Sequence, residues 1–229
     1  MKTETQLNPN NAGMARRSFL RYAGAGVAVA GIAAVGACKK DKTNPIDGVT
    51  DVGSGDFGIL NYAYALEQLE AAFYIQVVNS FEGSDFNDTE KELLADIRNH
   101  EVAHREFFKA ALGAKAIKGL TPDFSKIDFK KRASVLAAAK TFEDLGVTAY
   151  DGIAFKIVNP DYLTVAGKIV SVEARHASII ANLIEPGTFV DAPQVNRTNG
   201  LNISNGPTAV LAAANTFLVT KVSANSFTF

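Results

Sequence analysis

Two Glu-x-x-His motifs, each inside a long stretch of helical periodicity, constrain the fold of this chain more than any other feature. They are Glu101 with His104 and Glu173 with His176, and they use two of the three histidines. Residues three apart on a helix share a face, so each motif directs one carboxylate and one imidazole the same way. Carboxylate and imidazole are common metal ligands, and the pattern is typical of a metal site shared between helices.

Both motifs continue apolar stripes and are therefore expected to face inward. The first stripe contains Leu93, Leu94, Ile97, Phe107, Phe108 and Leu112. The second contains Val165, Ile169, Val172, Ile179, Ile180 and Leu183. A carboxylate in an apolar seam is destabilising unless it is paired or bound to a cation. A single motif of this kind is commonly a partly exposed glutamate beside a core histidine, but two in one chain favour a bound metal.

Two further helical stretches supply carboxylates, and each carries the spacing Glu-x6-Tyr about 30 residues before a Glu-x-x-His. The pairs are Glu67 with Tyr74 and Glu143 with Tyr150. Seven residues are nearly two helical turns, so the members of a pair share a face. We interpret the chain as a duplicated helical hairpin, because a repeat indicates more than any single motif. Glu70 shares the face of Glu67 and competes with it as a ligand, and the repeat favours Glu67.

This set of side chains carries a resemblance to a known family. One glutamate from each of two helices plus Glu-x-x-His from each of the other two is the ligand set of ferritin-like di-iron or di-manganese bundles. Over roughly residues 56–186 the chain resembles the ferritin-like superfamily, and the motif looks most like the six-ligand centres of bacterioferritins and manganese catalases. The run LNYAYALEQLEAAFY, from Leu60 to Tyr74, is also similar to the ferritin-like family that includes desiccation-related proteins.

The resemblance implies six metal ligands, namely Glu67, Glu101, His104, Glu143, Glu173 and His176. It implies two iron ions as cofactors, with two manganese ions or a mixed Fe/Mn pair as alternatives. It also implies that Tyr74 lies beside the centre as a candidate catalytic, redox-active tyrosine. Four glutamates and two neutral histidines balance the charge of two divalent cations.

The N-terminus independently predicts export. Arg16 and Arg17 begin a sequence with the form of a twin-arginine signal, and an apolar Gly/Ala-rich segment leads to Cys38, the only cysteine. A transmembrane anchor is the alternative, but about 16 weakly apolar residues are short for a span of about 20. We expect residues 1–37 to be a cleaved signal and Cys38 to be lipidated. The protein would then cross the membrane folded and be anchored in the cell envelope, periplasmic or on the outer surface.

Helix-capping and helix-ending residues along the chain predict an all-α fold. We expect a ferritin-like four-helix bundle of two antiparallel hairpins, plus a short C-terminal helix. Helices are expected at about 56–80, 88–113, 130–158 and 161–184, with Asn87 or Asp88 as an N-cap. The connection from Gly113 to Phe129 reaches about 55 Å when extended. A 25-residue helix is only about 38 Å long, so this connection can be the single long crossover.

The predicted bundle, residues 56–186, is flanked by a flexible tether over 38–55 and a C-terminal part over 187–229. The C-terminal part is expected to contain a loop, a short helix over 207–220 and an aromatic tail. We expect the helix and tail to dock on the bundle or on a second subunit of a homodimer, because much apolar area would otherwise be exposed. A frayed terminus is the alternative.

A few polar residues near the motifs have less certain roles. His100 lies one turn before the first motif and could support the site, but a polar residue at the edge of the stripe is the commoner interpretation. Asp96, Asp144 and Asp151 are unranked candidates for holding the outer ring nitrogens of the ligand histidines. We expect Tyr150 to pack in the core rather than to form a functional hydrogen bond.

Three classes of function fit these observations. The first is a di-iron or di-manganese oxidoreductase, of the ferroxidase, oxidase or peroxide-detoxifying class, acting with O2 or peroxide. The second is iron binding without turnover, and the third is a stress-protective structural bundle of the desiccation-related type. We favour the first because no ligand is missing. Residues 38–229 carry a net charge of −4 and no basic patch, which argues against a nucleic-acid partner.

Overall fold

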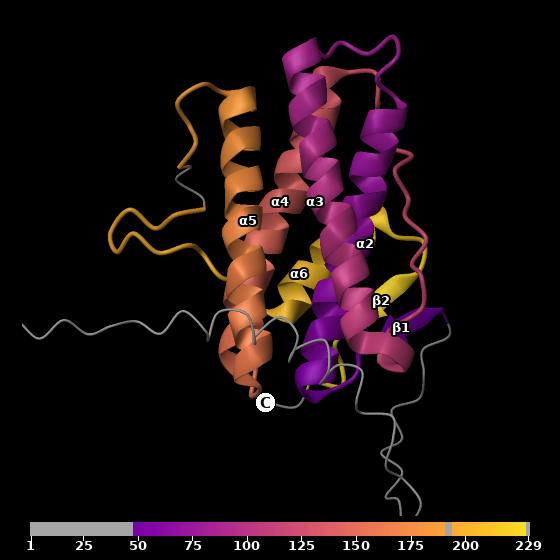
Figure 1. The fold of residues 1–229 in the computed structure, drawn as a ribbon, viewed down its shortest axis with the longest axis vertical. Helices are drawn as coiled ribbons and strands as arrows, with labels where there is room; N and C mark the ends of the chain where they lie inside the picture. The colour runs from indigo at the N-terminus through magenta and orange to yellow at the C-terminus, as the bar shows by residue number, and fades with distance from the viewer. Residues whose placement is uncertain (1–47, 191–193, 228–229) are drawn as a thin grey trace, which may run out of the picture.

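Four long helices dominate the structure, a computed structural model that describes residues 48–190 and 194–227 (Figure 1). They are α2 Gly55–Asn79, α3 Asp88–Leu112, α4 Arg132–Ile153 and α5 Pro160–Ile184. The predicted all-α, four-helix architecture is confirmed. Arg16, Arg17 and Cys38 lie outside the described residues. No helix within the described ranges combines the length and the apolarity that crossing a membrane requires.

The starts of α3 and α5 follow from local capping chemistry. The side chain of Asn87 accepts a hydrogen bond from the Glu90 amide at 2.9 Å, and the Glu90 carboxylate accepts one from the Asn87 amide at 3.2 Å. This reciprocal capping box confirms the expected N-cap at Asn87. At α5, Asn159 accepts from the Asp161 amide at 2.8 Å, and Pro160 occupies the first helical position.

The helices form two antiparallel hairpins, α2 with α3 and α4 with α5, joined by the predicted long crossover. After a 3₁₀ turn at Gly113–Lys115, the chain runs back along the side of the bundle and enters α4 at Arg132 (Figure 1). Helices α2 and α4 consequently run antiparallel to each other through the middle of the bundle, where they pack together.

A cluster of phenylalanines fills the core at one end of the α2–α4 contact. The ring centroid of Phe142 lies 4.9 Å from that of Phe73 and 4.7 Å from that of Phe217. Phe124 and Phe129 of the crossover pack on Phe73 with centroids 5.9 and 5.8 Å away. Most of these pairs meet edge to face, a geometry favoured by the ring quadrupoles. The cluster therefore attaches both the crossover and the C-terminal segment to the bundle.

The C-terminal segment docks on the bundle of its own chain, one of the arrangements expected from its composition. It contains α6 Pro207–Ala214, a 3₁₀ turn at Asn215–Phe217 and β2 Lys221–Ser223. Val210 and Leu211 of α6 are buried against the helices, and Phe227 meets Tyr62 edge to face at 6.0 Å. Gly152 of α4 makes this approach possible, because a Cβ there would lie 1.9 Å from the carbonyl oxygen of Asn205.

The prediction of a flexible tether over 38–55 is wrong for its last residues. Val49–Asp51 form strand β1, which pairs in parallel with β2, and Val52 is 1% exposed. The partner strand lies about 170 residues further along the chain, so no local pattern indicates the pairing. The N- and C-terminal ends of the described domain are thereby joined at one side of the bundle (Figure 1).

Two helices end earlier than expected. Helix α4 gives way at Ile153 to a 3₁₀ turn, because the amides of Val158 and Asn159 are bound by the carboxylate of Asp56 at 2.9 and 2.8 Å. The C-terminal helix ends at Ala214 rather than near residue 220. There the Asn215 side chain bonds both main-chain groups of Val222 and turns the chain into β2.

Adjacent residues of the C-terminal segment provide a matched test of its docking. Leu218 is 2% exposed and Val219 is 63% exposed. We predict that Leu218→Ala lowers the free energy of unfolding by about 2–5 kcal/mol because it leaves a cavity in the core. Val219→Ala should change it by less than about 0.5 kcal/mol. Equilibrium urea unfolding of the metal-free protein measures both, and equal effects would contradict the docked arrangement.

Candidate metal centre

Six side chains from the four long helices meet in the middle of the bundle, where the apolar stripes of all four helices face one another. They are Glu67 from α2, Glu101 and His104 from α3, Glu143 from α4, and Glu173 and His176 from α5. All four carboxylates are at most 1% exposed, whereas the His104 side chain is 14% exposed. The structure thus brings together every ligand predicted from the sequence, while metal binding by them remains a prediction.

The six side chains form two overlapping groups, each of which could hold a metal ion. Glu101 and Glu173 belong to both groups. Glu67 and His104 complete the first group, and Glu143 and His176 complete the second. Within each group the possible ligand atoms lie within 4.8 Å of one another.

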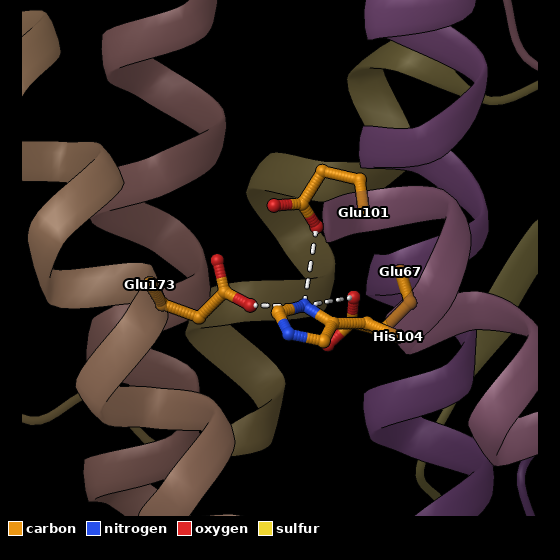
Figure 2. A group of neighbouring side chains, drawn as sticks. All are labelled: Glu67, Glu101, His104 and Glu173. Carbon is orange, nitrogen blue, oxygen red and sulfur yellow. Dashed lines mark ion pairs between the residues drawn. The ribbon is translucent and has the colours of Figure 1, made fainter. Parts of the chain in front are cut away.

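The two shared carboxylates each present one oxygen to each histidine. Glu173 places Oε1 at 2.8 Å from Nδ1 of His104 and Oε2 at 3.3 Å from Nδ1 of His176. Glu101 places Oε1 at 2.8 Å from Nδ1 of His176 and Oε2 at 3.7 Å from Nδ1 of His104. Figure 2 shows His104 directed at Glu101, Glu173 and Glu67 in this way. A carboxylate that bridges two cations requires this division of its oxygens.

The same atoms meet one another at ion-pair distances, but none makes a hydrogen bond of regular geometry. Among the described residues, eight buried atoms of the six side chains are in this position: Glu67 Oε2, both oxygens of Glu101 and of Glu173, Glu143 Oε2, and Nδ1 of His104 and His176. Buried polar atoms in folded proteins are nearly always satisfied. The donor set therefore fits a cation in each group, which would be held by Glu101 and Glu173 together with one further carboxylate and one imidazole.

Two tyrosines hold the remaining oxygens of the terminal carboxylates. Tyr74 donates to Oε1 of Glu143 at 2.5 Å, and Tyr150 donates to Oε1 of Glu67 at 2.6 Å. Each carboxylate is thereby left with Oε2 facing the cluster. Tyr74 lies beside the centre as expected.

The expectation that Tyr150 only packs in the core is wrong, because its hydroxyl binds Glu67. Seven residues on a helix rise about 10.5 Å, which is too far for a tyrosine to reach the glutamate of its own Glu-x6-Tyr pair. Since α2 and α4 are antiparallel, each tyrosine instead meets the glutamate of the other helix. Their hydrogen bonds lock the two hairpins in register.

Burial and neighbouring charge shift the carboxylate pKa values in opposite directions. Burial favours the neutral form of every carboxylate here, but hydrogen bonds from both ligand histidines outweigh it at Glu101 and lower its pKa to about 2. At Glu143 burial outweighs the hydrogen bond from His176, and the pKa rises to about 8. Burial, followed by repulsion from Glu173, raises the pKa of Glu67 well above its usual value.

Two histidines, His104 and His176, have raised pKa values in the metal-free protein. Burial alone would lower the pKa of His176, but hydrogen bonds to Glu101, Glu143 and Glu173 raise it to about 12. The pKa of His104 is raised in the same way. Without metal, protons therefore neutralise the carboxylate cluster at neutral pH, and a cation has to displace them.

Glu70, the competitor of Glu67, is buried but belongs to neither group of possible ligands. Burial, followed by repulsion from Glu101, raises its pKa well above the usual value, which favours the neutral acid. Its carboxylate lies against Gly146 of α4, where an added Cβ would be 2.9 Å from Oε1. The geometry favours Glu67 as the ligand, as the repeat predicted.

From the sequence, His100 is interpreted as a polar residue at the edge of the apolar stripe, but it also contacts a histidine of the cluster. Its Nδ1 lies 2.9 Å from Nε2 of His176, the histidine of the other Glu-x-x-His motif. Asp144, one of the acids considered for an outer nitrogen, forms a 2.7 Å ion pair with Lys140. In the sequence His100 lies one turn before His104 on the same helix, which suggests a role at that motif. Its partner, His176, lies on α5 and is identified only by the three-dimensional structure.

Comparison with known proteins supports the fold. The sequence model of the ferritin-like domain family matches residues 55–186, which span the four long helices and all six clustered side chains. No curated protein matches the chain.

The metal-free protein is predicted to lose stability as the pH rises from about 5 to about 8. Glu143 titrates near 8 and His176 near 12 in the folded protein, against ordinary values of 4.5 and 6.5. The folded state therefore binds more protons than the unfolded chain throughout this interval, so the free energy of unfolding falls with rising pH. Thermal unfolding at constant ionic strength measures the trend. Glu143→Gln should make the dependence of stability on pH weaker. A thermal unfolding midpoint that rises as the pH approaches 8 would contradict the prediction that the folded state binds more protons than the unfolded chain.

Proposed function

The chain belongs to the ferritin-like domain family, and on that premise we propose that it binds two divalent metal ions and uses them for oxidation by O2 or peroxide. The observation that carries the proposal is the pair of four-ligand groups that share Glu101 and Glu173. In this proposal Glu67 and His104 would hold one ion, Glu143 and His176 would hold the other, and the shared carboxylates of Glu101 and Glu173 would serve both.

The donor chemistry favours iron or manganese. The groups offer oxygen and nitrogen atoms only, which suit Fe(II) and Mn(II). Four ionised glutamates and two neutral histidines compensate two divalent charges, so the loaded site would be neutral inside an apolar bundle. We propose iron as the native metal, with manganese or a mixed pair as alternatives. When bound, such a pair would supply electrons for the reduction of O2 or peroxide.

The protein's own contribution is to exclude water, to orient ligands and to hold protons. The bridging carboxylates are 0% exposed, so bulk water has no direct access to them. Tyr74 stays protonated because burial raises its pKa well above the ordinary value of a phenol. Its hydroxyl contacts Glu143 directly, so a proton released on oxidation of Tyr74 has an acceptor at Oε1. These properties make Tyr74 the candidate catalytic residue of the chain itself.

A small apolar cavity beside Tyr150 favours a small oxidant. It has a volume of about 20 Å³ and is lined by side chains such as Leu66, Phe108 and Ala149. Tyr150 forms part of its wall and also donates to Glu67, so one ring separates the cavity from the cluster. A cavity of this size holds one molecule as small as water or O2.

We also propose export and anchoring, on the sequence alone. Residues 1–37 would direct twin-arginine export, and Cys38 would carry the lipid that holds the domain at the cell envelope. Cys38→Ser is expected to move the protein from the membrane fraction to the soluble fraction, because its only cysteine is lost. Fractionation followed by immunoblotting measures this, and an unchanged distribution would refute lipidation at Cys38.

Metal stoichiometry tests the binding proposal. The wild-type protein, loaded with Fe(II) without oxygen and desalted, should retain two ions per chain. Glu101→Ala removes a ligand of both groups and should reduce the content to less than one. Glu106→Ala, which alters a half-exposed residue of the same helix, should keep both ions. Metal analysis and circular dichroism of each variant separate lost ligation from lost folding.

Turnover is then tested by oxygen consumption and peroxide decay with the Fe(II)- and Mn(II)-loaded protein. Consumption that depends on Glu101 supports an oxidoreductase. Bound metal without turnover contradicts the redox proposal and leaves iron binding. A folded wild-type protein that retains no metal contradicts both and leaves the stress-protective structural bundle.

A further inference from the structure

His100 holds the ligand His176 from the side opposite the carboxylates. Nδ1 of His176 faces the cluster, 2.8 Å from Glu101, while its Nε2 faces Nδ1 of His100 at 2.9 Å. The two ring planes lie within 8° of parallel, with centroids 5.2 Å apart. His100 belongs to α3 and His176 to α5, so this contact crosses between the two hairpins.

The direction of the hydrogen bond follows from the surroundings of His176. Its Nδ1 lies among three carboxylates, where it either donates a proton to them or gives its lone pair to a cation. When Nδ1 gives its lone pair to a cation, Nε2 carries the proton, because a neutral imidazole that binds a metal through one nitrogen has hydrogen on the other. In the metal-loaded protein Nε2 of His176 is therefore the donor and Nδ1 of His100 the acceptor.

The two halves of the cluster differ in this respect. Within the described part of the chain, Nε2 of His104 forms no hydrogen bond, whereas Nε2 of His176 is held by His100. An acceptor on the outer nitrogen of a ligand histidine fixes its tautomer and ring orientation and makes it a stronger ligand. Loss of such a partner typically weakens metal binding by about 10–100-fold.

We propose that His100 is a positioning residue that makes the His176 half of the centre the tighter of two metal sites. This inference rests on the proposed function, because it assumes that both groups bind metal. His100 is exposed and contacts the ring of His176, so its replacement leaves the packing of the core in place.

Mn(II) titration of three variants tests this inference. His100→Phe keeps a flat ring against His176 but removes the acceptor, and it should weaken one of the two sites about 10–100-fold while leaving the other unchanged. His100→Gln retains an acceptor oxygen and should restore much of the lost affinity. Asn99→Ala, at an exposed neighbouring position, should leave both sites as in the wild type. Isothermal titration, with electron paramagnetic resonance to count free Mn(II), measures both sites.

A spectroscopic signature separates positioning from a general loss of structure. In Zn(II)-loaded protein with ¹⁵N-labelled histidine, the Nε2–H proton of His176 should be visible and slow to exchange in the wild type and lost in His100→Phe. Two sites of unchanged affinity in His100→Phe, or equal weakening of both, would overturn the inference while leaving the proposed function intact. A wild-type protein that binds neither Mn(II) nor Fe(II) would instead refute the proposed function.

Discussion

Four carboxylates buried together in an apolar bundle are the constraint on which the rest of the structure depends. Glu101, Glu143 and Glu173 are 0% exposed and Glu67 is 1% exposed. Like charges this close and this dry cannot all remain ionised without positive charge among them. Protons on the carboxylates and histidines provide that charge in the metal-free protein, and two divalent cations would provide it in the loaded one. The fold therefore requires compensating positive charge, from protons or from cations, at the centre of the bundle.

The repeated helical hairpin explains how the chain builds a cluster with two similar halves. Each hairpin supplies one glutamate, one tyrosine and one Glu-x-x-His pair, and the long crossover sets α2 antiparallel to α4. Each tyrosine then meets the glutamate of the opposite hairpin, and the carboxylates of Glu101 and Glu173 each contact both clustered histidines. The approximate symmetry is broken on the outside, where only His176 has a histidine behind it.

The helices and the six clustered residues could be predicted because their signals are local. A 3.6-residue period locates each helix, and a glutamate on an apolar stripe marks a site that must be compensated. What the sequence did not reveal depends on long-range contacts. The strand at Val49–Asp51 has its partner at Lys221–Ser223, and Tyr150 and His100 have partners on other helices. No window of sequence around these residues contains the group that they bind.

Anomalous diffraction from crystals of the Fe(II)-loaded protein tests the central claim most directly. The account predicts two iron peaks inside the bundle, one among Glu67, His104 and the shared carboxylates, the other on the His176 side. Glu101 and Glu173 should each place one carboxylate oxygen within bonding distance of each iron peak. A single peak, or iron bound only at the surface while the cluster keeps its protons, would contradict it.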